Sequence, residues 1–127
     1  MIVKLSAILF SCLVGIVVLF QFGLALGMPW GKAAMGGKYP GKFPVRMRIA
    51  SVVQMFILIT LAIIVLIKAE LIIVQLKLFS VSAIWIVVVF STISTILNII
   101  TRSKIERNIW APTSILLLVT SIIIALA

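Results

Sequence analysis

The side chains of this chain that could do chemistry are mainly basic. Five of its eleven Lys and Arg residues lie within residues 27–48, and three more lie within residues 102–107. Residues 27–48 also hold five of the seven glycines and three of the four prolines. Free N–H groups in glycine-rich turns, combined with Lys and Arg, form a concavity that suits an anion. The anion-binding candidates are the basic residues and paired glycines of these segments: Lys32, Gly36, Gly37, Lys38, Lys42, Arg46, Arg48, Arg102 and Arg107.

Other chemistries lack the residues that they need. The chain has no His, no Asp and one Cys, and its two acids, Glu70 and Glu106, fall in different loops. Metal sites need clusters of His, Cys or carboxylates, and two-carboxylate hydrolysis needs a pair at one site. We therefore predict no catalytic residue, no metal, no cofactor and no enzymatic activity.

Composition places these residues in a membrane protein. Hydrophobic residues make up 65% of the 127 positions and charged residues 10%, whereas charged residues make up about 25% of a soluble domain. Each of four uncharged runs is close to the roughly 20 residues that a helix needs to cross the hydrocarbon layer. We predict an all-α fold, an integral membrane bundle of four transmembrane helices in a single domain over residues 1–127. The helices are expected at about 5–26, 49–67, 78–100 and 109–127, with a basic Gly/Pro loop at 27–48.

The first apolar run has an alternative interpretation as a cleaved signal peptide. Lys4 gives it a basic start, and residues 25–27 offer small side chains at a cleavage position. The run is longer than the apolar core of a signal peptide, which is about 7 to 15 residues. We therefore expect a retained helix.

The distribution of charge predicts the orientation in the membrane. Eight of the eleven basic residues lie in the first and third loops, and only Lys4, Lys68 and Lys77 lie elsewhere. Short loops rich in Lys and Arg stay on the cytoplasmic side. We predict a multi-pass protein of the cell (inner) membrane with loops one and three in the cytoplasm and both termini outside. No soluble basic face with stacking aromatics is present, so nucleic acid is not an expected partner.

Aromatic and polar residues beside the basic loops extend the predicted site. Trp30, Tyr39 and Trp110 are amphipathic side chains that prefer the headgroup layer. Asn98, Arg102 and Glu106 recur every four residues, so we expect them on one face of an extended third helix. The first loop is then either an interfacial hairpin with basic anchors or a formed anion site.

The predicted spans carry few polar side chains. Small hydroxyl residues let helices approach closely, and Asn in lipid seeks a partner on a neighbouring helix. Helix packing is the first interpretation, and the lining of a solute path is the alternative. The residues concerned are Gln21, Gln54, Ser91, Ser94, Thr95 and Asn98.

Several of these motifs occur together in a known family. The chain contains Pro29-Trp30-Gly31, Gly36-Gly37, and Pro44 followed by Arg46 and Arg48. It also contains residues 98–103 followed by Glu106, Arg107, Trp110 and Pro112. With these motifs the chain resembles a family of small uncharacterised bacterial four-span membrane proteins. The resemblance implies the architecture and supplies no activity.

The residues thus favour a non-enzymatic membrane protein whose cytoplasmic basic and aromatic face engages anionic lipid headgroups or a protein partner. Membrane lipids, a second copy of the chain or another membrane protein are the expected partners. The alternative is a homo-oligomeric channel or a small-solute transporter that uses the polar residues of the third helix.

Overall fold

A computed structural model describes residues 1–127 and confirms an all-α fold without strands. Four long helices form the bundle: α1 (Ile2–Leu26), α2 (Val45–Lys68), α3 (Lys77–Ile100) and α4 (Lys104–Ala125). Each of the four is long and apolar enough to cross a membrane. Three short 3₁₀ turns lie in the loops: η1 (Gly31–Ala33), η2 (Met35–Gly37) and η3 (Val74–Leu76).

All four helices begin earlier than their uncharged runs, α2 and α4 by about one turn. Helix α2 begins at Val45, and α4 begins at Lys104 rather than near residue 109. The Ser103 hydroxyl accepts a hydrogen bond from the Glu106 N–H at 3.2 Å, and this N-cap starts α4. Charged residues can remain helical here because their ends reach the polar membrane interface.

The expected extension of the third helix is wrong. Helix α3 ends at Ile100, Thr101 turns the chain, and Glu106 already belongs to α4. Asn98, Arg102 and Glu106 therefore do not share one helix face. The cause is the Ser103 N-cap, which begins a new helix before another turn of α3 can form.

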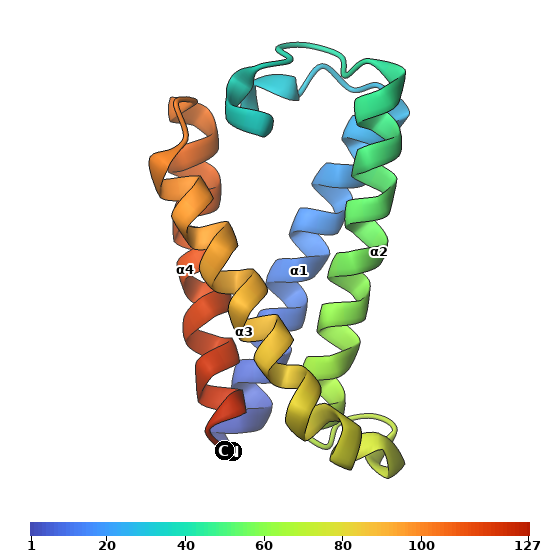
Figure 1. The fold of residues 1–127 in the computed structure, drawn as a ribbon, viewed down its shortest axis with the longest axis vertical. Helices are drawn as coiled ribbons and strands as arrows, with labels where there is room; N and C mark the ends of the chain where they lie inside the picture. Colours follow the sequence, from blue (N-terminus) through green and yellow to red (C-terminus); the bar gives the residue numbers. More distant parts are fainter.

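The helices form a ring: α1 contacts α2, α2 contacts α3, α3 contacts α4, and α4 contacts α1. Figure 1 shows residues 27–44 arching over one end of the bundle, with the chain termini at the other. We call these residues the covering loop, and we call this end, which also holds residues 101–103, the basic end. The other end is the opposite end.

The packed core lies toward the opposite end. Phe10 of α1, Val65 of α2, Ile84 of α3 and Ile124 of α4 are all buried, and each lies in the half of its helix nearest that end. Outside the ring the helices expose large apolar side chains, as expected of a surface that faces lipid. The half of the bundle beneath the covering loop is packed less completely.

Candidate functional site

The covering loop is shaped by a turn at its start and by a close approach between Gly31 and Gly41. Gly27 adopts a left-handed conformation (φ 92°), and the Met28 N–H donates to the Gly23 carbonyl oxygen at 3.0 Å, which closes α1. Further along, the Gly31 N–H donates to the Gly41 carbonyl oxygen at 2.9 Å. A Cβ on Gly31 would lie 1.8 Å from the Tyr39 carbonyl oxygen, so only glycine allows this approach.

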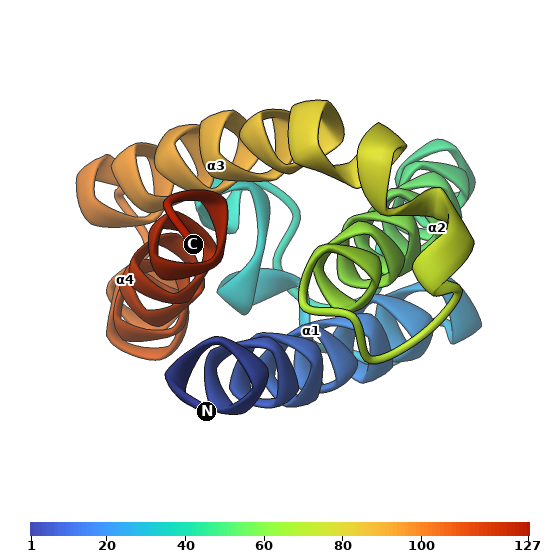
Figure 2. The same cartoon turned by 90° about the horizontal axis from the view of Figure 1, so that it is seen from below.

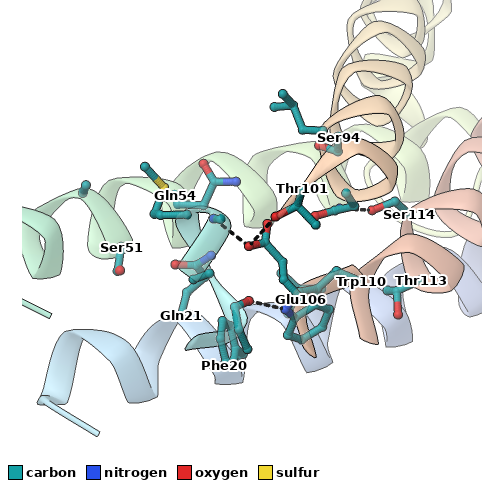
Figure 3. A pocket seen from close by; sticks show the side chains of 18 of the residues that line it. Phe20, Gln21, Ser51, Gln54, Ser94, Thr101, Glu106, Trp110, Thr113 and Ser114 are labelled. Atoms are coloured by element: carbon teal, nitrogen blue, oxygen red, sulfur yellow. Dashed lines mark hydrogen bonds between the residues drawn. The ribbon is translucent and has the colours of Figure 1, made fainter. Parts of the chain in front are cut away.

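Three hydrogen bonds tie the covering loop to α4 and the turn before it. The Ser103 hydroxyl donates to the Lys32 carbonyl oxygen. The Trp110 Nε1 donates to the Ala33 carbonyl oxygen at 2.8 Å. The Gly36 N–H donates to the Glu106 Oε2 at 2.7 Å, and Figure 3 shows this carboxylate among the residues that line the pocket. Residues distant in sequence are thereby held together at the basic end.

The anion that the glycine-rich turn binds is therefore the protein's own Glu106 carboxylate rather than an external ligand. Glu106 is buried, and its Oε2 also accepts a hydrogen bond from the Thr101 hydroxyl at 3.2 Å. The Gly37 N–H donates to the Ala34 carbonyl oxygen at 2.9 Å. Neither of the two paired glycines has a free N–H group for an external anion.

Aromatic rings close the gap between α1 and α4 beneath the covering loop. The ring of Phe20 stacks on Trp30 with centroids 6.0 Å apart, and it meets Trp110 at 4.8 Å. The Trp30 ring lies directly on Gly23, where an added Cβ would be 2.0 Å from it. Tyr39 lies apart from this stack and packs edge-on against Phe43, with centroids 5.9 Å apart. Trp30 and Trp110 thus belong to one cluster, and Tyr39 does not.

A cavity of about 920 Å³ lies beneath the covering loop. Its floor consists of Val17, Leu58, Phe90 and Leu117, one residue from each helix. Leu58 lies 13 residues beyond the start of α2, about 20 Å along the helix at a rise of roughly 1.5 Å per residue. Below that level the packed core closes the bundle. The polar residues of the cavity wall come from all four helices: Gln21, Ser51, Gln54, Ser94, Asn98, Thr113 and Ser114.

The cavity opens sideways between α2 and α3. The residues of α1 and α4 that line it are buried or half-buried. In contrast, Ala50 of α2 and Leu97 and Ile100 of α3 both line the cavity and are exposed. Both helices are long and apolar enough to cross a membrane, so an opening between them is on the side of the bundle that lipid would cover.

Two of the predicted cations stand at this cavity. Lys38 of the covering loop and Arg102 of the turn before α4 line it and are exposed. Lys32, Lys42 and Arg46 lie exposed outside the cavity.

The other two predicted arginines hold helix ends. The Arg48 Nε donates to the Ala25 carbonyl oxygen at 2.8 Å, and Arg107 donates to the Thr101 carbonyl oxygen at 3.1 Å. These carbonyls lie at the C-terminal ends of α1 and α3, where cations are stabilising.

The polar residues of the third helix divide into two groups. Ser94 and Asn98 line the cavity together with Gln21 and Gln54 from the first two helices. Asn98 Nδ2 also donates to the Ser114 hydroxyl across the α3–α4 interface. Ser91 and Thr95 are buried, lie outside the cavity lining and are linked by a hydrogen bond from the Thr95 hydroxyl to the Ser91 carbonyl oxygen.

Some site residues have a weak signal or none in the sequence. The four-residue spacing places Glu106 on the third helix, which is wrong, although Ser103 followed three residues later by Glu106 is a helix-start signal. Ser51 and Ser114 gave no signal, because serines in an apolar helix are equally compatible with packing.

The fold and the cavity define a multi-pass membrane protein with four spanning helices. Compared with known proteins, the chain matches no family model, no curated protein and no solved structure. The resemblance to small bacterial four-span proteins therefore stays a prediction.

Proposed function

We propose that this is a non-enzymatic membrane protein whose basic end lies on the cytoplasmic side of the cell membrane and gathers anionic lipid headgroups. The observation that carries the proposal is the imbalance of exposed charge at this end. Its only acid, Glu106, is buried beneath the covering loop, and Glu70 pairs with Lys77 at the opposite end, at 2.6 Å. The exposed cations of the basic end are Lys32, Lys38, Lys42, Arg46, Arg102, Lys104 and Arg107.

Lipid headgroups fit this arrangement better than an acidic soluble partner does. Trp30 is 40% exposed and belongs to the same loop as Lys32 and Lys38. Tryptophan prefers the headgroup layer, so the neighbouring cations would lie at the depth of lipid phosphates. Each Lys or Arg near an anionic surface contributes about 1 kcal/mol, and the attraction fades within a Debye length of about 10 Å at 0.1 M salt.

The proposal is tested by replacing cations that take no part in the fold. Lys32, Lys42 and Arg46 donate no side-chain hydrogen bond within the chain and lie outside the cavity. Changing all three to Gln should lower the ratio of phosphatidylglycerol to phosphatidylcholine retained by the purified protein several-fold, with the difference shrinking as salt rises.

The matched control compares two single changes. Lys42→Gln and Lys4→Gln each remove one exposed lysine, the first at the basic end and the second near the opposite end. Only Lys42→Gln should lower the ratio. Equal ratios for the triple variant and the unmodified protein would refute the proposal.

A second candidate function is a small-solute carrier or a homo-oligomeric channel. The observation that favours it is that Gln21, Gln54, Ser94 and Asn98 line a single cavity, which reaches deep between the helices. The packed core closes the cavity below Leu58, so transport would require the helices to move. Solute efflux from protein-containing liposomes, absent from protein-free liposomes, would support this function over the first.

A further inference from the structure

We propose that the cavity is a binding site for a single anionic phospholipid of the surrounding bilayer. One acyl chain would lie in the cavity, and the headgroup would meet Lys38 and Arg102 at the mouth. This inference rests on the proposed function, because it names one defined site within the basic end. The cavity of about 920 Å³ falls near the top of the range of about 300–1,000 Å³ that is usual for ligand sites.

The cationic and apolar ends of the cavity are arranged like the phosphate and the acyl chains of a lipid in the adjoining leaflet. The floor is formed by apolar side chains such as Leu58 and Leu117, and the cations Lys38 and Arg102 stand at the basic end. A lipid in that leaflet has its phosphate at the membrane surface and its chains toward the midplane. It can therefore enter sideways without turning over.

The mouth allows an acyl chain to pass. Ala50 is small, and Leu97 and Ile100 are apolar, so no charged group needs to be stripped of water for the chain to enter. The aromatic cluster closes the other side of the cavity, between α1 and α4. The geometry therefore selects one route, between α2 and α3.

Two carboxamides that line the cavity are suited to donate hydrogen bonds to the ester groups of the lipid. Gln21 of α1 and Gln54 of α2 both line the cavity, and Figure 3 draws no hydrogen bond from either to the other lining residues shown. Both residues are half-buried, and neither side chain donates a hydrogen bond within the chain, so their N–H groups can meet an acceptor inside the cavity. The ester carbonyl oxygens of a phospholipid are acceptors that lie between headgroup and chain, so they would meet these donors.

The headgroup contact follows from the charges at the mouth. Arg102 presents a planar guanidinium that can hold two phosphate oxygens, and Lys38 adds a second positive charge. The Glu106 carboxylate nearby is engaged by the Gly36 N–H and the Thr101 hydroxyl rather than by either cation. The two cations are thus available to an external phosphate.

The test uses full-length protein and counts bound phosphatidylglycerol by native mass spectrometry after release from a mild detergent. Ala50→Trp fills the mouth from an exposed position, so the fold should be preserved. Val53→Trp, on the same helix and 54% exposed but outside the cavity lining, is the matched control. We expect Ala50→Trp to lower occupancy by the first, tightest lipid at least about tenfold, and Val53→Trp to leave it unchanged.

A second pair of variants tests the headgroup. Lys38→Gln with Arg102→Gln should reduce the preference of the tightest site for phosphatidylglycerol over phosphatidylcholine by about tenfold or more, as expected from removing two cations. Equal occupancy in Ala50→Trp and Val53→Trp, or an unchanged headgroup preference, would overturn the inference. The triple change at Lys32, Lys42 and Arg46 reports separately on the wider basic end. If it has no effect while Ala50→Trp displaces the tight lipid, the proposed function fails and the inference stands.

Discussion

Replacement of Glu106 should release the covering loop without unfolding the helices. Its carboxylate accepts hydrogen bonds from the Gly36 N–H at 2.7 Å and from the Thr101 hydroxyl at 3.2 Å, and only 8% of the residue is exposed. Hydrogen bonds to a charged group are worth about 1.5–3 kcal/mol, roughly twice as much as neutral ones. Glu106→Gln keeps the shape and removes the charge, so it should weaken the contact with Gly36 by about 1 kcal/mol.

Glu106→Ala should have a larger effect, because it removes the acceptor completely. A buried donor left without a partner costs about 1–3 kcal/mol, which applies to the buried Thr101 hydroxyl, and the exposed Gly36 loses a hydrogen bond to a charged group worth about 1.5–3 kcal/mol. The total of at least about 2 kcal/mol corresponds to roughly thirtyfold more frequent opening, compared with about fivefold for Glu106→Gln.

Hydrogen exchange followed by mass spectrometry measures these openings. Amides of residues 34–38 should exchange faster in the order wild type, Glu106→Gln, Glu106→Ala, while amides of Val65 and Ile84 in the packed core keep their rates. The matched control is Glu70→Gln, because Glu70 is the only other acid and lies at the opposite end. Equal exchange at residues 34–38 in wild type and Glu106→Ala would refute the view that this carboxylate holds the loop.

Three further changes have definite expected outcomes. Gly23→Ala places a Cβ 2.0 Å from the Trp30 ring, so it should displace the indole, shift tryptophan emission to longer wavelength and lower stability by about 1–3 kcal/mol. Asn98→Leu removes the hydrogen bond to α4 and should lower the free energy of unfolding in detergent by about 0.6–2 kcal/mol. Lys77 holds the pKa of the Glu70 carboxyl below its usual range through a hydrogen bond and its charge. The small stabilisation from this exposed pair should therefore be present at neutral pH and disappear as the pH falls through the lowered pKa, and Lys77→Gln should raise that pKa in an NMR titration.

Each of these changes has a control that separates its cause from a general effect. Gly15→Ala adds a methyl group to the same helix where no atom lies within 4 Å, so it should not shift the emission. Ile99→Leu alters an exposed neighbour of Asn98 and should leave stability nearly unchanged. An equal loss of stability for Asn98→Leu and Ile99→Leu would mean that the hydrogen bond contributes nothing. A Glu70 pKa that stays low after Lys77→Gln would remove the ion pair as its cause.

The spans could be predicted because each helix contains an uninterrupted uncharged run long enough to cross the hydrocarbon layer. The helix ends could not be predicted from charge. Charge marks where the hydrocarbon ends, whereas a helix ends where its backbone finds other partners. Lys104 is charged and helical, because Ser103 caps the helix there and the lysine side chain reaches the interface.

The lining of the cavity depends on how α3 crosses its neighbours, and the sequence of α3 alone does not determine that crossing. Ser91 and Thr95 lie outside the cavity lining, while Ser94 and Asn98, on the same helix, line it. All four belong to one polar stripe, and only the crossing of α3 over its neighbours decides which side faces a void. That crossing follows from packing between helices at the opposite end, where Ile84 and Val87 meet the core. The sequence could therefore identify the polar residues but not divide them between packing and lining.

The glycine-rich loop and the free cations are connected through Glu106. A carboxylate among so many basic residues would ordinarily pair with one of them and reduce the positive potential of the basic end. Here the Gly36 N–H and the Thr101 hydroxyl bind it instead, and its place in the first turn of α4 adds the favourable field of a helix N-terminus. Its charge is thereby compensated by dipoles, and Lys38 and Arg102, which line the cavity, form no ion pair, although the Lys38 Nζ lies 5.7 Å from the centroid of the Tyr39 ring. The Gly36 N–H thus serves the proposed site indirectly, because it helps to hold the protein's own anion away from the cations that would meet a ligand.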